Sequence, residues 1–192
     1  EILFVWNLNF AKTCSKIIYQ RQKYVEALLP YAKEVFKGLS SGKEEIDFVL
    51  KGSFDYQNLS AAEIEEKLME ELENKKAVDI LNKNTSVGAH RDDLEIFING
   101  REARIFGSQG QQRSCVIALK LAESSLLKEK TEIMPVALLD DVMSELDEKR
   151  QDYILNHIKE WQVFITCCDK NTILRLKKGK TIHIENGRII GE

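Results

Sequence analysis

The stretch Val136-Ala137-Leu138-Leu139-Asp140-Asp141 decides the fold class of this chain. Its run of four apolar residues favours a strand that is buried on both faces of a sheet. The two carboxylates at its end would then lie where open α/β sheets bind their ligands. In phosphoryl-transfer sites the first acid of such a pair holds Mg2+, and the second orients or deprotonates the attacking water. A pair of solvated turn acids is the alternative, and the run alone does not decide between the two interpretations.

Two further motifs flank this strand. Downstream, Ser144-Glu145-Leu146-Asp147 has the Ser-x-Leu-Asp spacing of a D-loop, although Asp147 also suits the N-cap of a following helix. Upstream, residues 107–112 (GSQGQQ) open an amphipathic helix, where a serine hydroxyl, a glycine amide and a helix N-terminus together suit a terminal phosphate. A capping box from Ser108 to Gln111 is the alternative there. The order of the three motifs favours a nucleotide site.

The first part of the chain is predicted to be helical. Apolar residues recur at helical spacing over residues 3–39, and Pro30 is expected to kink or split this helix. A strand is predicted over residues 46–50, and a second helix begins at a capping box formed by Ser60 and Glu63. We therefore expect residues 1–84 to form an α-helical arm subdomain with a small strand element.

From Thr85 onward, helices alternate with strands. Asn99-Gly100 between strands over 94–98 and 101–106 predicts a type I′ hairpin. A strand over 163–166 and two more, joined by a second Asn-Gly turn, are predicted toward the end of the chain. Residues 85–192 should therefore form an α/β lobe, with a mixed sheet flanked by helices.

Composition bears on partners and compartment. The net charge of −3 gives no overall sign of nucleic-acid binding, so DNA contacts must come from a local basic patch or from parts outside these 192 residues. Four cysteines without C-x-x-C spacing, and no secretory or membrane-spanning segment, predict free thiols in a reducing cytoplasm. Because the first residue is Glu1, already within a predicted helix, we expect a piece of a longer protein.

The ordered motifs resemble the C-terminal lobe of an ABC-type ATPase head of the SMC kind, and their fuller text is similar to the RecF family. The resemblance is most specific in the α/β lobe and extends more weakly into the arm through residues 41–45. It is carried by three segments: Gly88-Ala89-His90-Arg91-Asp92-Asp93-Leu94, Phe106-Gly107-Ser108-Gln109-Gly110-Gln111-Gln112-Arg113 and Leu138-Leu139-Asp140-Asp141-Val142-Met143-Ser144-Glu145-Leu146-Asp147.

The resemblance implies a role for each motif. Asp140 would be the Walker B residue that holds Mg2+, and Asp141 would occupy the catalytic-base position, where glutamate is commoner. Thr166 stands where many relatives place a switch histidine. His90 and Arg91 would face a phosphate or a partner carboxylate, with a polar turn as the alternative. The signature, which contacts ATP in trans, would be formed by Ser108, Gln109, Gly110 and Gln111. The D-loop would be formed by Ser144, Glu145, Leu146 and Asp147.

The phosphate-binding loop G-x-x-x-x-G-K-[ST] is missing from the sequence. The nearest match, residues 38–44 (GLSSGKE), is one residue short, has glutamate after the lysine and follows a helix. In ABC-type heads this loop belongs to the N-terminal lobe. We therefore expect ATP and Mg2+ to bind only together with that lobe, and the chain alone to bind ATP weakly or not at all.

The resemblance implies an ATP-gated DNA clamp of recombinational repair. Such a protein would dimerise with ATP on DNA gaps or single-strand/double-strand junctions, hydrolyse ATP slowly, and help load RecA together with RecO and RecR. One alternative is an SMC-like structural protein with a long coiled coil, which the turn at residues 38–42 disfavours. Another is a magnesium-dependent nuclease built on Asp140 and Asp141, which would need further acids.

Overall fold

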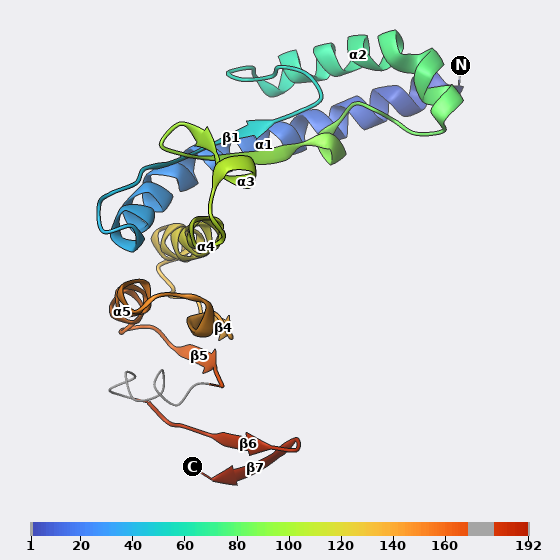
Figure 1. Cartoon of the computed structure of the whole chain (residues 1–192). Coiled ribbons are helices and arrows are strands. Elements are labelled where there is room, and N and C mark those ends of the chain that lie inside the picture. Colours follow the sequence, from blue (N-terminus) through green and yellow to red (C-terminus); the bar gives the residue numbers. More distant parts are fainter. Residues whose placement is uncertain (1, 169–178, 192) are drawn as a thin grey trace.

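The computed structural model describes residues 2–168 and 179–191 of the chain, and all but the side chain of Glu145 within them. Helices dominate, and small sheets lie between them and at the end of the chain (Figure 1). The helices are α1 (Ile2–Leu39), α2 (Ala61–Asn82), α3 (Ala103–Phe106), α4 (Gln109–Thr131) and α5 (Glu148–His157), with short 3-10 turns at η1 (Ala89–Arg91) and η2 (Met143–Glu145). The strands are β1 (Ile46–Lys51), β2 (Asp93–Ile98), β3 (Arg101–Glu102), β4 (Ala137–Asp140), β5 (Val163–Thr166), β6 (His183–Glu185) and β7 (Arg188–Gly191).

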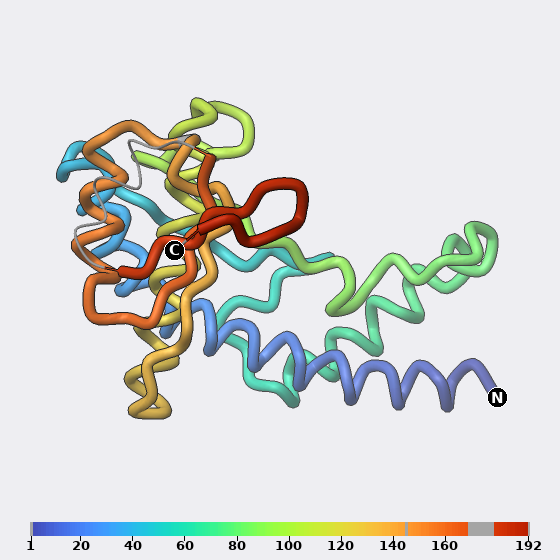
Figure 2. Tube along the Cα trace, turned by 90° about the horizontal axis from the view of Figure 1, so that it is seen from below, coloured from blue at the N-terminus to red at the C-terminus, as the bar shows by residue number. Residues whose placement is uncertain are grey.

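The first part of α1 and the whole of α2 lie side by side and form an arm that extends away from the rest of the molecule (Figures 1 and 2). α2 begins at the capping box expected from sequence, in which Ser60 Oγ accepts a hydrogen bond from Glu63 N. Their apolar stripes face one another. The buried residues between them are Ala11, Cys14, Ile18, Ile64, Leu68 and Leu72.

Pro30 does not split α1, so that part of the expectation was wrong. A proline inside a helix removes one backbone hydrogen bond and crowds the preceding turn. Here the turns on both sides are anchored, because Leu28 and Ala32 are buried against Phe48 of β1 and Leu126 of α4. Packing of these turns therefore outweighs the local cost of the proline.

β1, β2 and β3 form an antiparallel sheet in that order, with Ile46 opposite Ile98. Asn99 and Gly100, with φ of 49° and 76°, make the predicted I′-type hairpin between β2 and β3. β1 and β2 come from opposite sides of the boundary expected at residues 84/85, so this sheet joins the two parts. The division into 1–84 and 85–192 stays a prediction.

The strand expected over residues 101–106 ends at Glu102, and the next four residues form the helical turn α3. The turn is held from the following helix. Gln112 Nε2 donates to Ala103 O at 3.0 Å and to Gly107 O at 3.1 Å, and Gly107 N donates back to Ala103 O. The expected strand was therefore wrong beyond Glu102, where these bonds hold a helical turn instead.

β4 and β5 pair in parallel, with Asp140 opposite Thr166. Leu139, Val163 and Ile165 pack against the buried side of α4 and α5. Leu138 and Phe164, on the other face, are 74% and 59% exposed. The expectation of burial on both faces is therefore wrong for the part of the chain that the structure describes, because helices cover only one face there. The α/β architecture with a helical subdomain is confirmed.

Gly38, near the end of α1, lies against the ring of Tyr153 on α5. A β-carbon at Gly38 would lie 2.0 Å from Tyr153 Cε2, much closer than atoms can approach. The ring also stacks on His157, with the two centroids 5.8 Å apart. The missing side chain at Gly38 thus leaves the space that the Tyr153 ring occupies.

Replacing Gly38 with alanine should lower the free energy of unfolding by about 1–3 kcal/mol, because the new methyl group overpacks the contact with Tyr153. At an ordinary helix position the same change would raise stability by about 1 kcal/mol. In a Tyr153→Ala background, Gly38→Ala should therefore be neutral or stabilising. Urea unfolding followed by circular dichroism in both backgrounds measures the difference, and equal losses in the two would contradict the steric explanation.

Candidate functional site

The two acids of the decisive stretch lie at the end of β4, next to the end of β5. Thr166 Oγ1 donates a short hydrogen bond to Asp140 Oδ1. Asp141 N donates to Thr166 O at 3.2 Å and to Thr166 Oγ1 at 3.1 Å. Parallel pairing of the strands thus brings the proposed switch residue onto both acids, which a sequence separation of 25 residues does not reveal.

The backbone of Asp141 is left-handed, with φ of 50°. Aspartate tolerates this conformation better than most residues, and such conformations cluster at functional sites. The turn that follows is closed by Ser144 Oγ, which donates to Asp141 O at 2.9 Å. Both Asp140 and Asp141 are exposed to solvent. The chain therefore presents two carboxylates on a turn that hydrogen bonds from Thr166 and Ser144 hold in place.

The predicted D-loop, Ser144–Asp147, forms the turn η2 and the start of α5. Met143 and Leu146 are buried, and Gln151 Nε2 donates to the carbonyl oxygens of both, at 2.7 and 3.0 Å. Asp147 is the N-cap of α5, and its Oδ1 accepts from Arg150 N at 3.1 Å. That backbone hydrogen bond is the main reason why the pKa of Asp147 lies below its usual value. The N-cap alternative for Asp147 is thus formed.

The predicted signature, Ser108–Gln111, begins α4 and forms the capping box that was its alternative interpretation. Ser108 Oγ accepts from Gln111 N at 3.3 Å, and Ser108 N donates to Gln111 Oε1 at 2.8 Å. Ser108 and Gln109 are nevertheless exposed. Gln111 Nε2 also donates to Glu44 Oε1 at 2.5 Å, which ties the signature to the loop before β1. A capped helix start can still bind a phosphate, because its other first-turn amides remain without intrahelical partners.

Arg150 pairs with Asp147 of the predicted D-loop and lies beside Gly110 of the predicted signature, and no motif in the sequence marks it. Its Nη1 lies 2.6 Å from Asp147 Oδ2. A β-carbon at Gly110 would lie 3.4 Å from the same Nη1. The first turns of α4 and α5 therefore meet at this guanidinium. The spacing of Asp147 and Arg150 was the only signal in the sequence, and it is common at helix starts.

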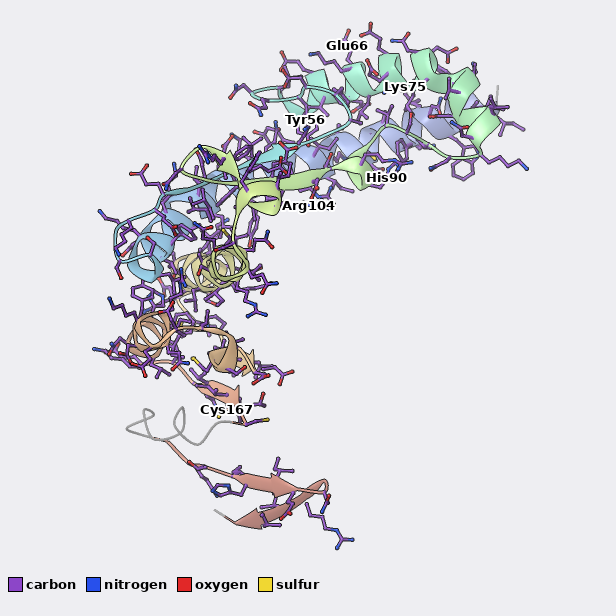
Figure 3. The ribbon with its side chains drawn as sticks, in the orientation of Figure 1. Tyr56, Glu66, Lys75, His90, Arg104 and Cys167 are labelled. Atoms are coloured by element: carbon purple, nitrogen blue, oxygen red, sulfur yellow. The ribbon has the colours of Figure 1, made fainter. Side chains whose placement is uncertain are left out.

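His90 and Arg91 lie elsewhere, in the turn η1 beside the arm. Both bond to Thr85 O, His90 through Nε2 at 2.8 Å and Arg91 through Nη2 at 2.8 Å. Figure 3 shows His90 next to α1, while Cys167, directly after Thr166, lies near the opposite end of the molecule. The structure thus does not bring the His-Arg pair to the acids.

The turn that carries His90 and Arg91 is anchored by an ion pair. Arg21 Nη1 lies 2.8 Å from Asp92 Oδ2, and the side chain of Asp92 is only 2% exposed. The same Nη1 donates to Ala89 O. Burial, and then the neighbouring Asp92, raise the pKa of the Tyr56 hydroxyl far above its usual value. This buried cluster fixes η1 against α1.

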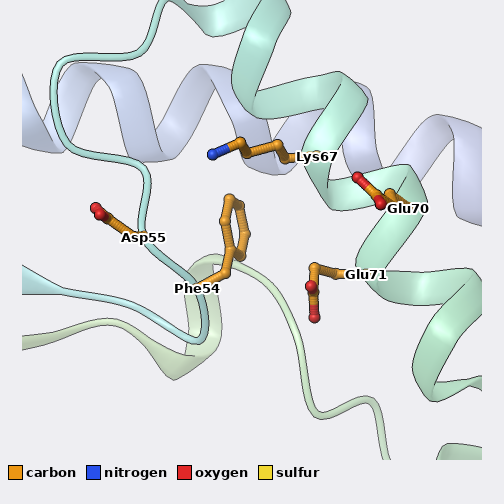
Figure 4. Close-up of a pocket in the computed structure, with 5 residues that line it drawn as sticks. All are labelled: Phe54, Asp55, Lys67, Glu70 and Glu71. Carbon is orange, nitrogen blue, oxygen red and sulfur yellow. The ribbon is translucent and has the colours of Figure 1, made fainter.

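Hollows in the surface of the described residues include the following two. One, of about 220 Å³, is lined by Phe54, Asp55, Lys67, Glu70 and Glu71, and Figure 4 shows it between α2 and the loop after β1. It contains no predicted site residue. The other, of about 430 Å³, includes Phe106, Gly107 and Gln111 beside the start of α4. Of the two, only this second hollow adjoins the candidate site.

Neither a metal cluster nor a membrane span is found in the described ranges. Across residues 2–168 and 179–191, no three His, Cys, Asp or Glu side chains come together as metal ligands. Over those same residues, no helix combines the length and the apolar character that crossing a membrane requires.

Comparison with known proteins gives consistent matches. The chain is 40% identical to the DNA replication and repair protein RecF of Clostridium perfringens and 38% identical to that of Bacillus cytotoxicus, over 98% of the chain and 52% of each relative. The chain thus spans about half the length of the curated relatives it matches. The recombination mediator protein RecF-ATPrS in the RecFOR pathway superimposes with a TM-score of 0.84 and 33% identity, over 98% of this chain and 50% of that one. The corresponding RecF-ATP structure gives a TM-score of 0.77 and 36% identity, over 88% of this chain and 45% of that one. No protein-family model matches.

Proposed function

We infer the function of this chain from its place in the RecF family, to whose C-terminal portion it corresponds. The family consists of DNA replication and repair proteins, and its solved members include RecF with ATP. Our proposal is that this chain supplies the residues that sense and hydrolyse ATP held by the other half of the protein. It therefore acts through assembly.

One observation carries the proposal: the hydrogen-bonded group of Asp140, Asp141 and Thr166 at the carboxyl ends of β4 and β5. This edge is where open α/β sheets bind ligands. We propose that Asp141 orients or deprotonates a water that attacks the γ-phosphate. Thr166 hydrogen-bonds to the Asp140 carboxylate and to the backbone N of Asp141, and we propose that it acts as the switch residue. With aspartate in the base position, we expect hydrolysis to be slow.

The residues present fit a magnesium ion. Mg2+ in nucleotide sites commonly uses one or two carboxylates and completes its shell with phosphate oxygens and water, so the lack of a larger acid cluster is no obstacle. The exposed carboxylate of Asp140, oriented by Thr166, would hold it. Mg2+ there would neutralise charge on the β- and γ-phosphate oxygens.

Assembly follows from the position of the signature. The 192 residues contain no phosphate-binding loop, whereas Ser108 and Gln109 are exposed at the start of α4. We propose that they meet the γ-phosphate of ATP bound by a second subunit, so that two copies close around the nucleotide. Hydrolysis then removes the phosphate that holds them together.

The partners are proposed from the family. A dimer closed by ATP would hold DNA at gaps or single-strand/double-strand junctions and would work with RecO and RecR to load RecA. The name of the RecFOR pathway in the matching structures supports RecO and RecR as partners. The net charge of −3 over this chain means that its DNA contacts must be local or must come from the rest of the protein.

We first check by circular dichroism that the isolated chain is folded. It should then give no heat of binding in a calorimetric titration with ATP and Mg2+ up to about 1 mM. A dissociation constant of that size corresponds to a binding free energy of about −4 kcal/mol. The whole protein should bind ATP and, in sedimentation velocity, pass from monomer to dimer when ATP is added. Micromolar binding by the isolated chain, or a whole protein that stays monomeric with ATP, would overturn the proposal.

A further inference from the structure

Arg150 lies between two predicted motifs. Its backbone N and its guanidinium both bond to the carboxylate of Asp147. Asp147 Oδ1 accepts from Arg150 N at 3.1 Å, and Asp147 Oδ2 lies 2.6 Å from Arg150 Nη1. Both oxygens of the D-loop acid are thus engaged by one residue. This fixes the orientation of the carboxylate as well as the start of α5.

The side chain of Arg150 is half-buried. It is 21% exposed, compared with 51% for that of Asp147. Its Nε is buried, and no described residue accepts a hydrogen bond from it. The planar guanidinium presents its donors in a fixed fork. Asp147 is therefore paired with a guanidinium whose inner nitrogen lies inside the fold, while the Nη1–Oδ2 contact itself lies at the surface.

The other neighbour of the guanidinium is the signature. A β-carbon at Gly110 would lie 3.4 Å from Arg150 Nη1. The guanidinium therefore lies next to the open space where a side chain at position 110 would stand. Ser114 Oγ donates to Gly110 O at 2.7 Å from the next turn of α4, which fixes this glycine from the other side. The guanidinium of Arg150 on α5 thus lies beside the first turn of α4.

We propose that Arg150 is a positioning residue of the ATP site. It sets the distance and angle between the signature start at Gly110 and the D-loop acid Asp147. This rests on the proposed function, because those two motifs act on one nucleotide only in the assembled dimer. A purely structural N-cap ion pair is the competing explanation. That explanation predicts a loss of stability alone, whereas ours predicts a loss of alignment.

The test uses the whole protein. Arg150→Met keeps the aliphatic packing and removes the charge and the hydrogen bonds. We expect ATP-dependent dimerisation to weaken at least tenfold and kcat for hydrolysis to fall about tenfold, while KM for ATP and the binding of a fluorescent ATP analogue stay unchanged. Arg150→Lys, which can still reach Asp147, should restore dimerisation to within about threefold of wild type. Lys149→Ala removes an exposed charge one residue away and is the matched control.

The outcomes separate the two hypotheses. If wild type dimerises with ATP and Arg150→Met does so equally well, or if Arg150→Lys is as impaired as Arg150→Met, the role of Arg150 is overturned and the proposed function stands. If wild type itself stays monomeric with ATP, both are overturned. Melting temperatures are measured throughout. If Arg150→Met does not fold, Arg150→Gln, which keeps a donor toward Asp147 without the charge, takes its place and should weaken the dimer by more than Arg150→Lys and by less than the tenfold expected for Arg150→Met.

Discussion

Replacing Asp141 with asparagine should reduce ATP hydrolysis by the whole protein at least about 100-fold, the usual range for removing a general base. An amide occupies the same space as the carboxylate but does not accept the proton of the attacking water. The turn should keep its structure, because asparagine also tolerates the left-handed backbone at φ of 50°. The bonds from residue 141 to Thr166 come from the backbone N, so the substitution does not remove them. ATP-dependent dimers should therefore form normally and persist longer.

Phosphate release and sedimentation velocity on the same samples measure both effects of Asp141→Asn. Glu129→Gln makes the same change from acid to amide on the exposed end of α4 and should leave both unchanged. If Asp141→Asn retained a third or more of the hydrolysis rate, another group would have to act as the base. If it lost both hydrolysis and dimerisation, Asp141 would hold the site together rather than act on water.

Replacing Ser108 with arginine should raise the dissociation constant of the ATP-bound dimer at least about 100-fold, or about 2.7 kcal/mol. Ser108 is exposed at the start of α4, so a long cationic side chain there would fill the space that the partner's nucleotide must enter. Binding of ATP by each subunit should persist, since in our proposal the signature acts in trans. Equilibrium sedimentation with and without ATP measures the first quantity, and a fluorescent ATP analogue measures the second.

Ser108→Arg needs a control for the loss of the helix cap at the start of α4. The substitution also removes the acceptor that Gln111 N uses, and losing an N-cap costs about 1 kcal/mol of stability. Ser60→Arg removes an equivalent capping box, with Glu63, at the start of α2 in the arm. The two variants should lose similar stability, but only Ser108→Arg should lose the dimer. If Ser60→Arg weakened the dimer equally, general destabilisation would be the cause.

Features with local causes could be predicted from the sequence. Caps at Ser60, Ser108 and Asp147 form because the hydrogen-bonding side chain lies within three residues of its partner. The hairpin is also local, because Asn99 and Gly100 readily adopt the positive φ that its turn requires. The order of the predicted signature, the acidic strand and the predicted D-loop also indicated the resemblance to RecF. Whether the residues named in these motifs act as proposed stays a prediction.

Features with distant causes could not be predicted. The pairs Gln111–Glu44 and Arg21–Asp92 are 67 and 71 residues apart in sequence, and no local pattern marks them. Residues 101–106 have the composition of a strand, yet the last four of them form α3, whose first carbonyl oxygen accepts a bond from Gln112 on the following helix. The apolar run at β4 predicts a strand whose two faces can both be buried. It does not predict that the described helices cover only the face opposite Leu138.

The contact between Gly38 and Tyr153 ties one end of α1 to the helix that begins after the N-cap Asp147. With 38 residues, α1 is about 57 Å long, so its other end lies far away in the arm. Between these ends, α1 packs against α4, β1 and α2. A single continuous helix therefore spans the distance from the neighbourhood of the two acids to the tip of the arm.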